Sequence, residues 1–155
     1  MKWGIVPSWA KQKDFRPLIN ARVETIDEKV SFKKLIKTTR CVAVMDGFYE
    51  WKRSKESKTP FYFTREDKKP LYVAGIFENN EFCLITEEAS QNVMNIHHRQ
   101  PVILDHDEIS NYLDLKKDGK KYLSQIKKIP LSFHEISKEV NKPTNNYPSL
   151  ISKLN

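Results

Sequence analysis

The stretch "RCVAVMDGFYEWKR", residues 40–53, decides the fold class of this chain. It is rich in Val, Phe, Tyr and Trp, the residues that favour strands, and Asp46-Gly47 interrupts it as a turn pair would. The stretch therefore has a strand pattern with one interruption. Strand patterns also occur at residues 59–67 and 68–78, which we expect to form a hairpin around the turn "EDKK", and at residues 79–89 and 131–137.

Helical signals lie between and after these strands. Short helices are predicted in "SQNVMNIHHR" (90–99), in "DHDEISNYLDL" (105–115) with Asp105 or Asp107 as N-cap, and in "GKKYLSQIKK" (119–128). The sum predicts an α+β fold in a single domain over residues 1–155, with an antiparallel-rich sheet or partly open barrel and a few short helices.

Bulk composition places the chain among soluble globular proteins. It has 155 residues, 39% hydrophobic and 30% charged, which suits one domain with one core. No apolar run approaches the roughly 18 residues of a membrane span, and residues 1–10 do not resemble a signal peptide. We therefore expect a cytoplasmic protein, associated with the nucleoid when bound to DNA, without a membrane partner. Cys41 and Cys83 lie in apolar strings and are expected to be buried free thiols.

The net charge of +7 and the pI of about 9.3 fit a polyanionic partner, of which nucleic acid is the commonest. A lysine-rich solvated surface is the alternative, and the clusters at residues 116–128 fit it equally well. Charge alone leaves both interpretations open.

Four polar stretches are candidates for chemistry. In "INARVETI" (19–26), an extended backbone would place Asn20, Arg22 and Glu24 on one face. Glu50 lies among aromatic residues, where a carboxyl tends to have a raised pKa that suits a general acid or base. The other two are Thr86, near a strand end, and the run His97, His98 and Arg99.

Each candidate has a plainer interpretation as well. Asn20 can satisfy a turn, Glu50 can pair with Lys52 or Arg53, and His97 can be a hydrogen-bonded structural histidine. The four histidines and two cysteines show no metal-ligand spacing, so no metal and no cofactor are expected. The sequence contains no Walker loop, no GxGxxG and no G-x-S-x-G elbow.

Seven motifs in order carry a resemblance. They are "WGIVPSWA", "INARVETI", "RCVAVMDGFYEWK", "PFYF…LYVAGIFE", "ITEEA", "IHHRQPVIL" and "VNKPTNNYPSLI". Their order is similar to that of the SRAP family (SOS response-associated peptidases), and they span nearly the whole chain. The resemblance implies binding of single-stranded DNA and a covalent crosslink to abasic sites. The crosslink forms through an N-terminal cysteine that autoproteolytic removal of the initiator methionine exposes.

The resemblance also implies roles for particular residues. Asn20, Glu50 and His97 correspond to the family's catalytic residues, with Glu50 as proton shuttle, His97 as acid at the sugar and Asn20 as orienting group. Trp9, Arg22, Thr86 and Arg99 are implied to contact DNA, Trp9 by stacking on a base and the arginines by holding phosphates. We expect Asn20, Arg22, Glu50 and His97 to converge in one concave site of a monomer.

One departure from the family pattern concerns the N-terminus. Position 2 is Lys2, and "MKWG" corresponds to a place tens of residues into the family pattern. The expectation is that a segment with the family's cysteine normally precedes Met1. The chain as printed would then form no stable thiazolidine and would act as a single-stranded DNA-binding remnant. An unrelated basic α+β protein is the remaining alternative.

Overall fold

The computed structural model describes residues 1–10 and 14–154. The chain folds into two compact units. The first unit comprises residues 1–44, 72–88 and 101–129. The second comprises residues 45–71, 89–100 and 130–155. Each unit is therefore built from three separate stretches of sequence.

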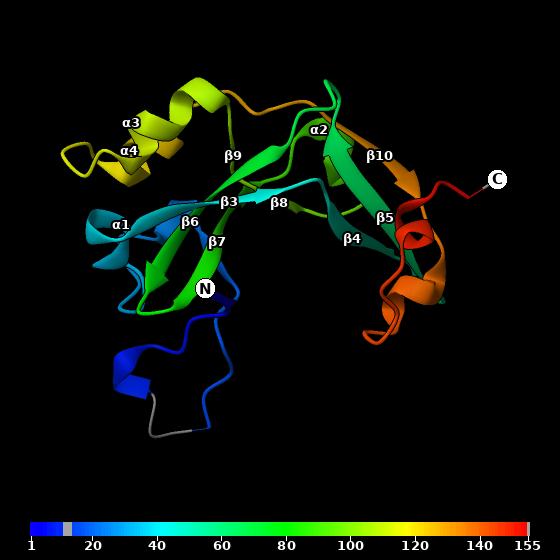
Figure 1. Cartoon of the computed structure of the whole chain (residues 1–155), viewed down its shortest axis with the longest axis horizontal. Coiled ribbons are helices and arrows are strands. Elements are labelled where there is room, and N and C mark those ends of the chain that lie inside the picture. The colour runs from blue at the N-terminus through cyan, green and yellow to red at the C-terminus, as the bar shows by residue number, and fades with distance from the viewer. Residues whose placement is uncertain (11–13, 155) are drawn as a thin grey trace. The chain divides into compact units, whose positions relative to one another are not determined.

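The sheet of the first unit is centred on two long strands that form a hairpin (Figure 1). Its main order is β1 (Lys2–Trp3), β7 (Glu81–Glu88), β6 (Leu71–Glu78) and β3 (Arg40–Met45). β2 (Asn20–Arg22) also pairs with β7, and β9 (Ile103–Leu104) pairs with β6. The β6–β7 turn is Asn79-Asn80, and Asn79 has a φ of 55°, the left-handed conformation that asparagine tolerates. β1 and β2 run parallel to β7.

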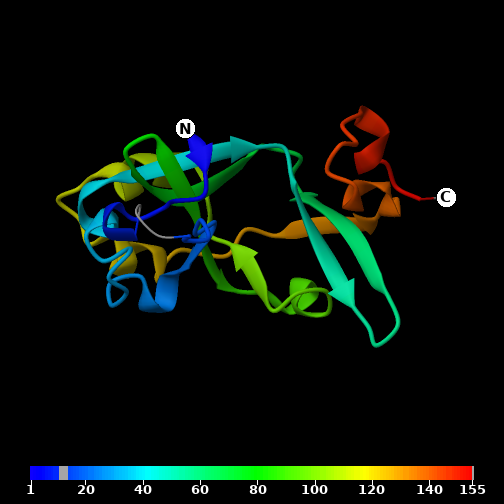
Figure 2. The ribbon, with the colours of Figure 1, turned by 90° about the horizontal axis from the view of Figure 1, so that it is seen from below.

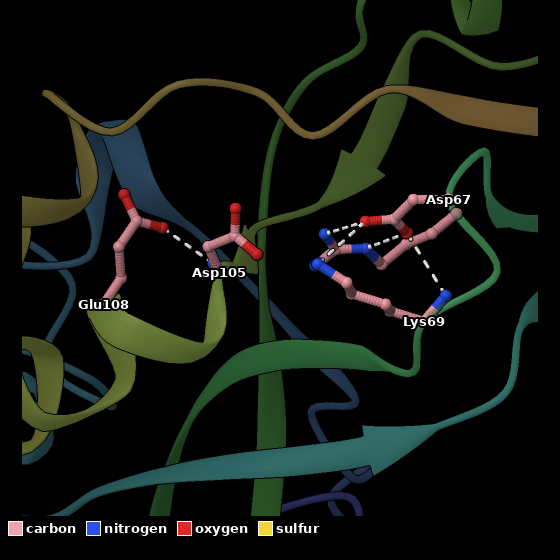
Figure 3. A network of polar contacts seen from close by, with 5 residues as sticks. Asp67, Lys69, Asp105 and Glu108 are labelled. Atoms are coloured by element: carbon pink, nitrogen blue, oxygen red, sulfur yellow. Dashed lines mark hydrogen bonds and ion pairs between the residues drawn. The ribbon is translucent and has the colours of Figure 1, made fainter.

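Short helices surround this sheet. They are η1 (Ser8–Ala10) and η2 (Val23–Thr25), which are 3-10 turns, α1 (Leu35–Thr38), the 3-10 turn η3 (His106–Glu108), α3 (Ile109–Leu113) and α4 (Gly119–Leu123). Asp105 and Glu108 form a capping box at η3, in which the backbone N–H of Asp105 donates to the Glu108 carboxylate at 2.8 Å (Figure 3). The predicted N-cap at Asp105 is therefore confirmed. The core beneath these elements includes Ile5, Ile26, Ile36, Ile76, Ile85, Leu104 and Tyr112.

The second unit is a three-stranded antiparallel sheet in the order β10 (Leu131–Glu135), β5 (Lys58–Arg65) and β4 (Phe48–Arg53). Figure 2 shows β4 and β5 side by side, joined by the turn at residues 54–57. Phe48 stacks on Phe63 with ring centroids 5.0 Å apart, and Phe133 lies 5.0 Å from Phe63 on the other side. This aromatic row fixes the register of all three strands.

The remaining elements of the chain belong wholly or mainly to the second unit. They are α2 (Gln91–Met94), β8 (Arg99–Pro101), η4 (Lys138–Asn141) and η5 (Pro148–Ile151), the last two being 3-10 turns. β8 begins in the second unit and ends in the first.

The α+β prediction is confirmed, with mostly antiparallel strands and short helices. The predicted hairpin between residues 59–67 and 68–78 is wrong. A turn does form there, with Lys68 at φ 62° and an ion pair of 3.6 Å between Asp67 and Lys69 (Figure 3). However, β5 pairs with β4 and β10, whereas β6 pairs with β7 and β9. The local sequence therefore predicted the turn correctly. The strands that pair with β5 and β6 depend on residues far away in the sequence, which the turn does not specify.

Candidate functional site

Glu50 lies in the middle of β4 among aromatic side chains. Its cross-strand partner on β5 is Phe61, and its side chain is 24% exposed. This burial raises the pKa of the Glu50 carboxyl above its ordinary value. The pKa stays raised although several neighbours lower it: His97, the backbone N–H of Trp51 and the nearby cations of β4 and β5. A carboxyl whose pKa is raised in this way is a candidate general acid or base.

His97 follows α2 and brings its imidazole to Glu50. The Nδ1 atom lies 3.5 Å from Oε1 of Glu50. The same Nδ1 lies 3.0 Å from the carbonyl oxygen of Arg99 and accepts from the Arg99 backbone N–H at 3.3 Å in its unprotonated form. A protonated Nδ1 donates to that carbonyl, so both protonation states have a backbone partner. The Arg99 backbone therefore holds the imidazole in place beside Glu50.

A pocket of about 560 Å³ adjoins this pair. It is lined by Trp51, Arg53, Met94, Ile96, His97 and His98. The Trp51 indole is held from two sides, because its Nε1 donates to Oδ1 of Asn141 at 2.7 Å and Nζ of Lys58 lies 4.6 Å from its ring centroid. An aromatic and aliphatic wall with nearby cations suits a flat, negatively charged ligand.

The "NAR" residues lie in the first unit, on β2. Ala21 is buried there, whereas Asn20 and Arg22 are exposed, so the predicted alternation holds for these two. Arg22 is in register with Thr86 of β7. Thr86 is 9% exposed, and its hydroxyl donates to the Ala21 carbonyl at 3.5 Å.

Trp9 and Arg99 occupy separate settings. Trp9 lies in η1 with 57% of its surface exposed, and its ring meets Phe15 edge-on at 5.6 Å. An indole in this position presents a stacking surface. Arg99 is half-buried at the start of β8.

Among the predicted residues, the structure brings Glu50 and His97 together in one unit and Arg22 and Thr86 together in the other. Convergence of Asn20 and Arg22 with Glu50 and His97 stays a prediction. Glu24 does not continue the β2 face, because the chain turns into η2 at Val23. The sequence analysis missed Trp51, Lys58 and Asn141. Only the position of Trp51 directly after Glu50 could have pointed to it.

Over residues 1–10 and 14–154, no group of three or more His, Cys, Asp or Glu side chains is arranged to hold a metal ion. Both cysteines are free, and burial raises the pKa of the Cys41 thiol to about 11 and of the Cys83 thiol to about 12. Such thiols are protonated at neutral pH and poor nucleophiles. Within the described ranges, no helix is long and apolar enough to cross a membrane.

Sequence comparison finds a family and named relatives. The pattern of the family described as SOS response associated peptidase (SRAP) matches residues 1–143. The abasic site processing protein YoaM of Bacillus subtilis is 33% identical over 171 residues, covering 100% of this chain and 75% of the relative. YedK of Escherichia coli, with the same description, is 33% identical and covers 98% and 73%. The abasic site processing protein HMCES of Gallus gallus is 34% identical and covers 97% and 56%.

Structural comparison gives the same fold. The crystal structure of a protein from Bacteroides thetaiotaomicron matches with a TM-score of 0.83 at 25% identity, covering 98% of this chain and 75% of that chain. The crystal structure of a phage-related protein from Bordetella bronchiseptica matches with a TM-score of 0.69 at 24% identity, covering 98% and 74%.

Proposed function

Because this chain belongs to the SOS response associated peptidase (SRAP) family, we propose that it binds single-stranded DNA and acts on abasic sites within it. Its relatives YoaM, YedK and HMCES are all named abasic site processing proteins. A function related to DNA damage follows from this membership. The strand preference and the chemistry are the proposed part.

The observation that carries the proposal is the Glu50–His97 pair beside the pocket that contains Trp51. An abasic sugar opens to an aldehyde. An amine that attacks its carbonyl carbon first gives a carbinolamine, which loses water to become an imine. A thiol that then adds across the C=N bond closes a thiazolidine. Each step moves a proton onto or off an oxygen or nitrogen, and a positioned acid–base group accelerates such transfers about 10²–10⁴-fold.

Glu50 and His97 divide this work in the proposal. Protonated His97 donates to the sugar ring oxygen as the ring opens, and Glu50 accepts a proton from the attacking amine and returns it to the departing hydroxyl. The 3.5 Å separation of Oε1 and Nδ1 places the two groups close enough to act on one substrate. In the family pattern, the amine and thiol belong to a cysteine that follows the initiator methionine. Position 2 here is Lys2, so the step proposed for this sequence is imine formation by a primary amine.

The DNA strand itself is held by charge and stacking. Arg22 and Arg99 are proposed to bind flanking phosphates, and Trp9 to stack on a base. The net charge of +7 supports binding that weakens steeply with salt. Asn20, exposed on β2, is proposed to orient the sugar or the amine, and Thr86 to support Arg22 from the neighbouring strand.

A second candidate function is binding of single-stranded DNA without covalent chemistry. The exposed Trp9 indole and the net charge favour it, because neither depends on a nucleophile.

One experiment separates the two functions. The protein is incubated with a single strand that carries one abasic site, or with the same strand carrying a tetrahydrofuran analogue that has no aldehyde. Borohydride is added to reduce any imine. An adduct on the abasic strand that Glu50→Gln slows about a hundredfold or more supports the acid–base proposal. Equal binding of both strands without any adduct supports binding alone, and no binding at low salt contradicts both.

A further inference from the structure

A second cavity, in the first unit, plays no part in the function proposed above. It has a volume of about 450 Å³ and lies where α1 and α4 contact each other. It is lined by Asp27, Ile36, Lys37, Arg40, Leu115, Lys116, Lys117, Asp118, Gly119 and Lys120. Five of these side chains are basic and two are acidic, so the cavity has a clear excess of positive charge.

Arg40 forms the fixed part of this charge. It is 7% exposed, and its guanidinium donates to the carbonyl oxygens of Ile36 at 2.6 Å, Tyr112 at 2.9 Å, Asp114 at 3.1 Å and Lys117 at 2.6 Å. Across the part of the chain that the structure describes, these partners are carbonyls and none is a carboxylate. The hydrogen bonds satisfy the N–H groups without cancelling the charge, and a buried charge acts strongly because the surrounding dielectric is low.

Gly119 allows the backbone to approach this guanidinium. A Cβ built at position 119 would lie 2.7 Å from both Cζ and Nε of Arg40. The cavity wall at this point is therefore bare backbone against the arginine.

The acidic side chains around the cavity are already engaged. Asp118 caps α4 by accepting from the Lys121 backbone N–H. Asp27 pairs with Lys120, with Oδ1 and Nζ 2.6 Å apart. Lys37 and Lys116 are exposed at the cavity and carry no such pair in the described residues. An incoming anion would meet these two lysines directly and would compete with Asp27 for Lys120.

We propose that this cavity binds a phosphate group between Lys37, Lys116 and Lys120, above the buried Arg40. The phosphate is carried either by the backbone of a nucleic acid or by a small phosphorylated molecule. The volume exceeds that of a single phosphate, and Ile36 and Leu115 offer an apolar wall for whatever the phosphate is attached to. Neither Glu50 nor His97 lines this cavity, so the proposal can be tested independently of the proposed function.

The direct test is titration of the protein with pyrophosphate at constant, low ionic strength, followed by amide NMR. Saturable shifts confined to the amides of residues 37 and 116–120 are expected. The double variant Lys37→Gln/Lys116→Gln should weaken binding about tenfold or more. The control Lys55→Gln/Lys153→Gln removes the same charge from two exposed lysines that do not line the cavity, and it should bind as the parent does.

Asp27→Asn is expected to strengthen pyrophosphate binding, whereas the lysine substitutions weaken it. Removing the carboxylate releases Lys120, so pyrophosphate should bind about threefold more tightly. A merely structural role for the Asp27–Lys120 pair would not produce this gain. The proposal is overturned if pyrophosphate leaves these amides unmoved, or if the two double variants bind it equally and Asp27→Asn gives no gain.

A second titration identifies the source of the phosphate. An unmodified single-stranded oligonucleotide is titrated into both double variants. A greater loss of affinity in Lys37→Gln/Lys116→Gln than in the control assigns the site to a nucleic-acid backbone. Equal DNA affinities, together with lost pyrophosphate binding, assign it to a small phosphorylated molecule. All these variants retain Glu50 and His97, so adduct formation on abasic DNA reports separately on the proposed function.

Discussion

Gly47→Ala tests how closely the turn at Asp46-Gly47 packs against Tyr62 and Phe63 of β5. A Cβ at position 47 would lie 2.4 Å from the carbonyl oxygen of Phe63, and 2.4 and 2.5 Å from Cζ and the hydroxyl oxygen of Tyr62. Real Cβ atoms do not approach so closely. The Tyr62 ring can move, but Phe63 belongs to β5, which is paired on both sides, so its carbonyl cannot retreat freely.

The expected cost has two parts. Overpacking a close-packed site costs about 1–3 kcal/mol, and loss of a strand hydrogen bond adds about 1 kcal/mol. Gly47→Ala should therefore lower the free energy of unfolding by about 2–4 kcal/mol. For a chain of this length, the melting temperature should fall by about 5–15 °C.

Urea unfolding followed by circular dichroism and by tryptophan fluorescence measures this loss. Gly75→Ala is the control, because it makes the same substitution at a buried glycine, within β6, where the added Cβ meets its neighbours at longer distances. Its added Cβ would lie 3.0 Å from the Cys83 carbonyl oxygen and 3.1 Å from Cys41 Sγ, which requires only a small adjustment. The control should lose about 1 kcal/mol. A loss in Gly47→Ala no greater than in Gly75→Ala would refute the reasoning.

Three further changes have defined outcomes. Glu50→Gln should stabilise the fold at pH 7–8 but not near pH 4. Burial raises the pKa of Glu50 in the folded state. The protonated carboxyl therefore contributes its full stability below the ordinary pKa of 4.5, and this contribution is lost as the pH rises through the folded-state pKa. Melting temperatures that differ between parent and variant by the same amount at both pH values would contradict this. Trp9→Ala should weaken single-stranded DNA binding by about 1–3 kcal/mol in a fluorescence titration while leaving the melting temperature nearly unchanged, since the side chain is 57% exposed; unchanged affinity would exclude stacking at this position. Arg40→Met should cost about 3 kcal/mol in urea unfolding, because four carbonyls lose their donor, and a cost below about 1 kcal/mol would mean that water replaces the guanidinium easily.

The strands were predictable where the signal was local. Residues 40–53 carry β-favouring side chains interrupted at Asp46-Gly47, and the structure has strands there, one on each side of the interruption. The pairing partners of β5 and β6 were not predictable in this way. A turn at Asp67 is compatible with strands that pair elsewhere. The prediction that Glu24 shares a face with Asn20 and Arg22 was wrong for a related reason. Alternation in the sequence does not show where the extended backbone ends.

The candidate site likewise contains features that the sequence predicted and features that it did not. Glu50 was identifiable as a carboxyl among aromatic residues, and its contact with His97 followed from the family resemblance. The Trp51–Asn141 hydrogen bond joins residues 90 positions apart, and no periodicity or spacing signals it. Interactions of this kind depend on how strands and 3-10 turns pack, which a single sequence does not record.

The most direct test of the central claim is the pH dependence of the borohydride-trapped adduct with a single abasic strand, measured for the parent chain and for Glu50→Gln under single-turnover conditions. We predict that the parent rate changes with pH through the titration of Glu50, whose pKa is raised by burial. Glu50→Gln should react about 10²–10⁴-fold more slowly and should lose the limb that Glu50 contributes. Equal rates and identical pH profiles for the two proteins would show that Glu50 takes no part in the chemistry.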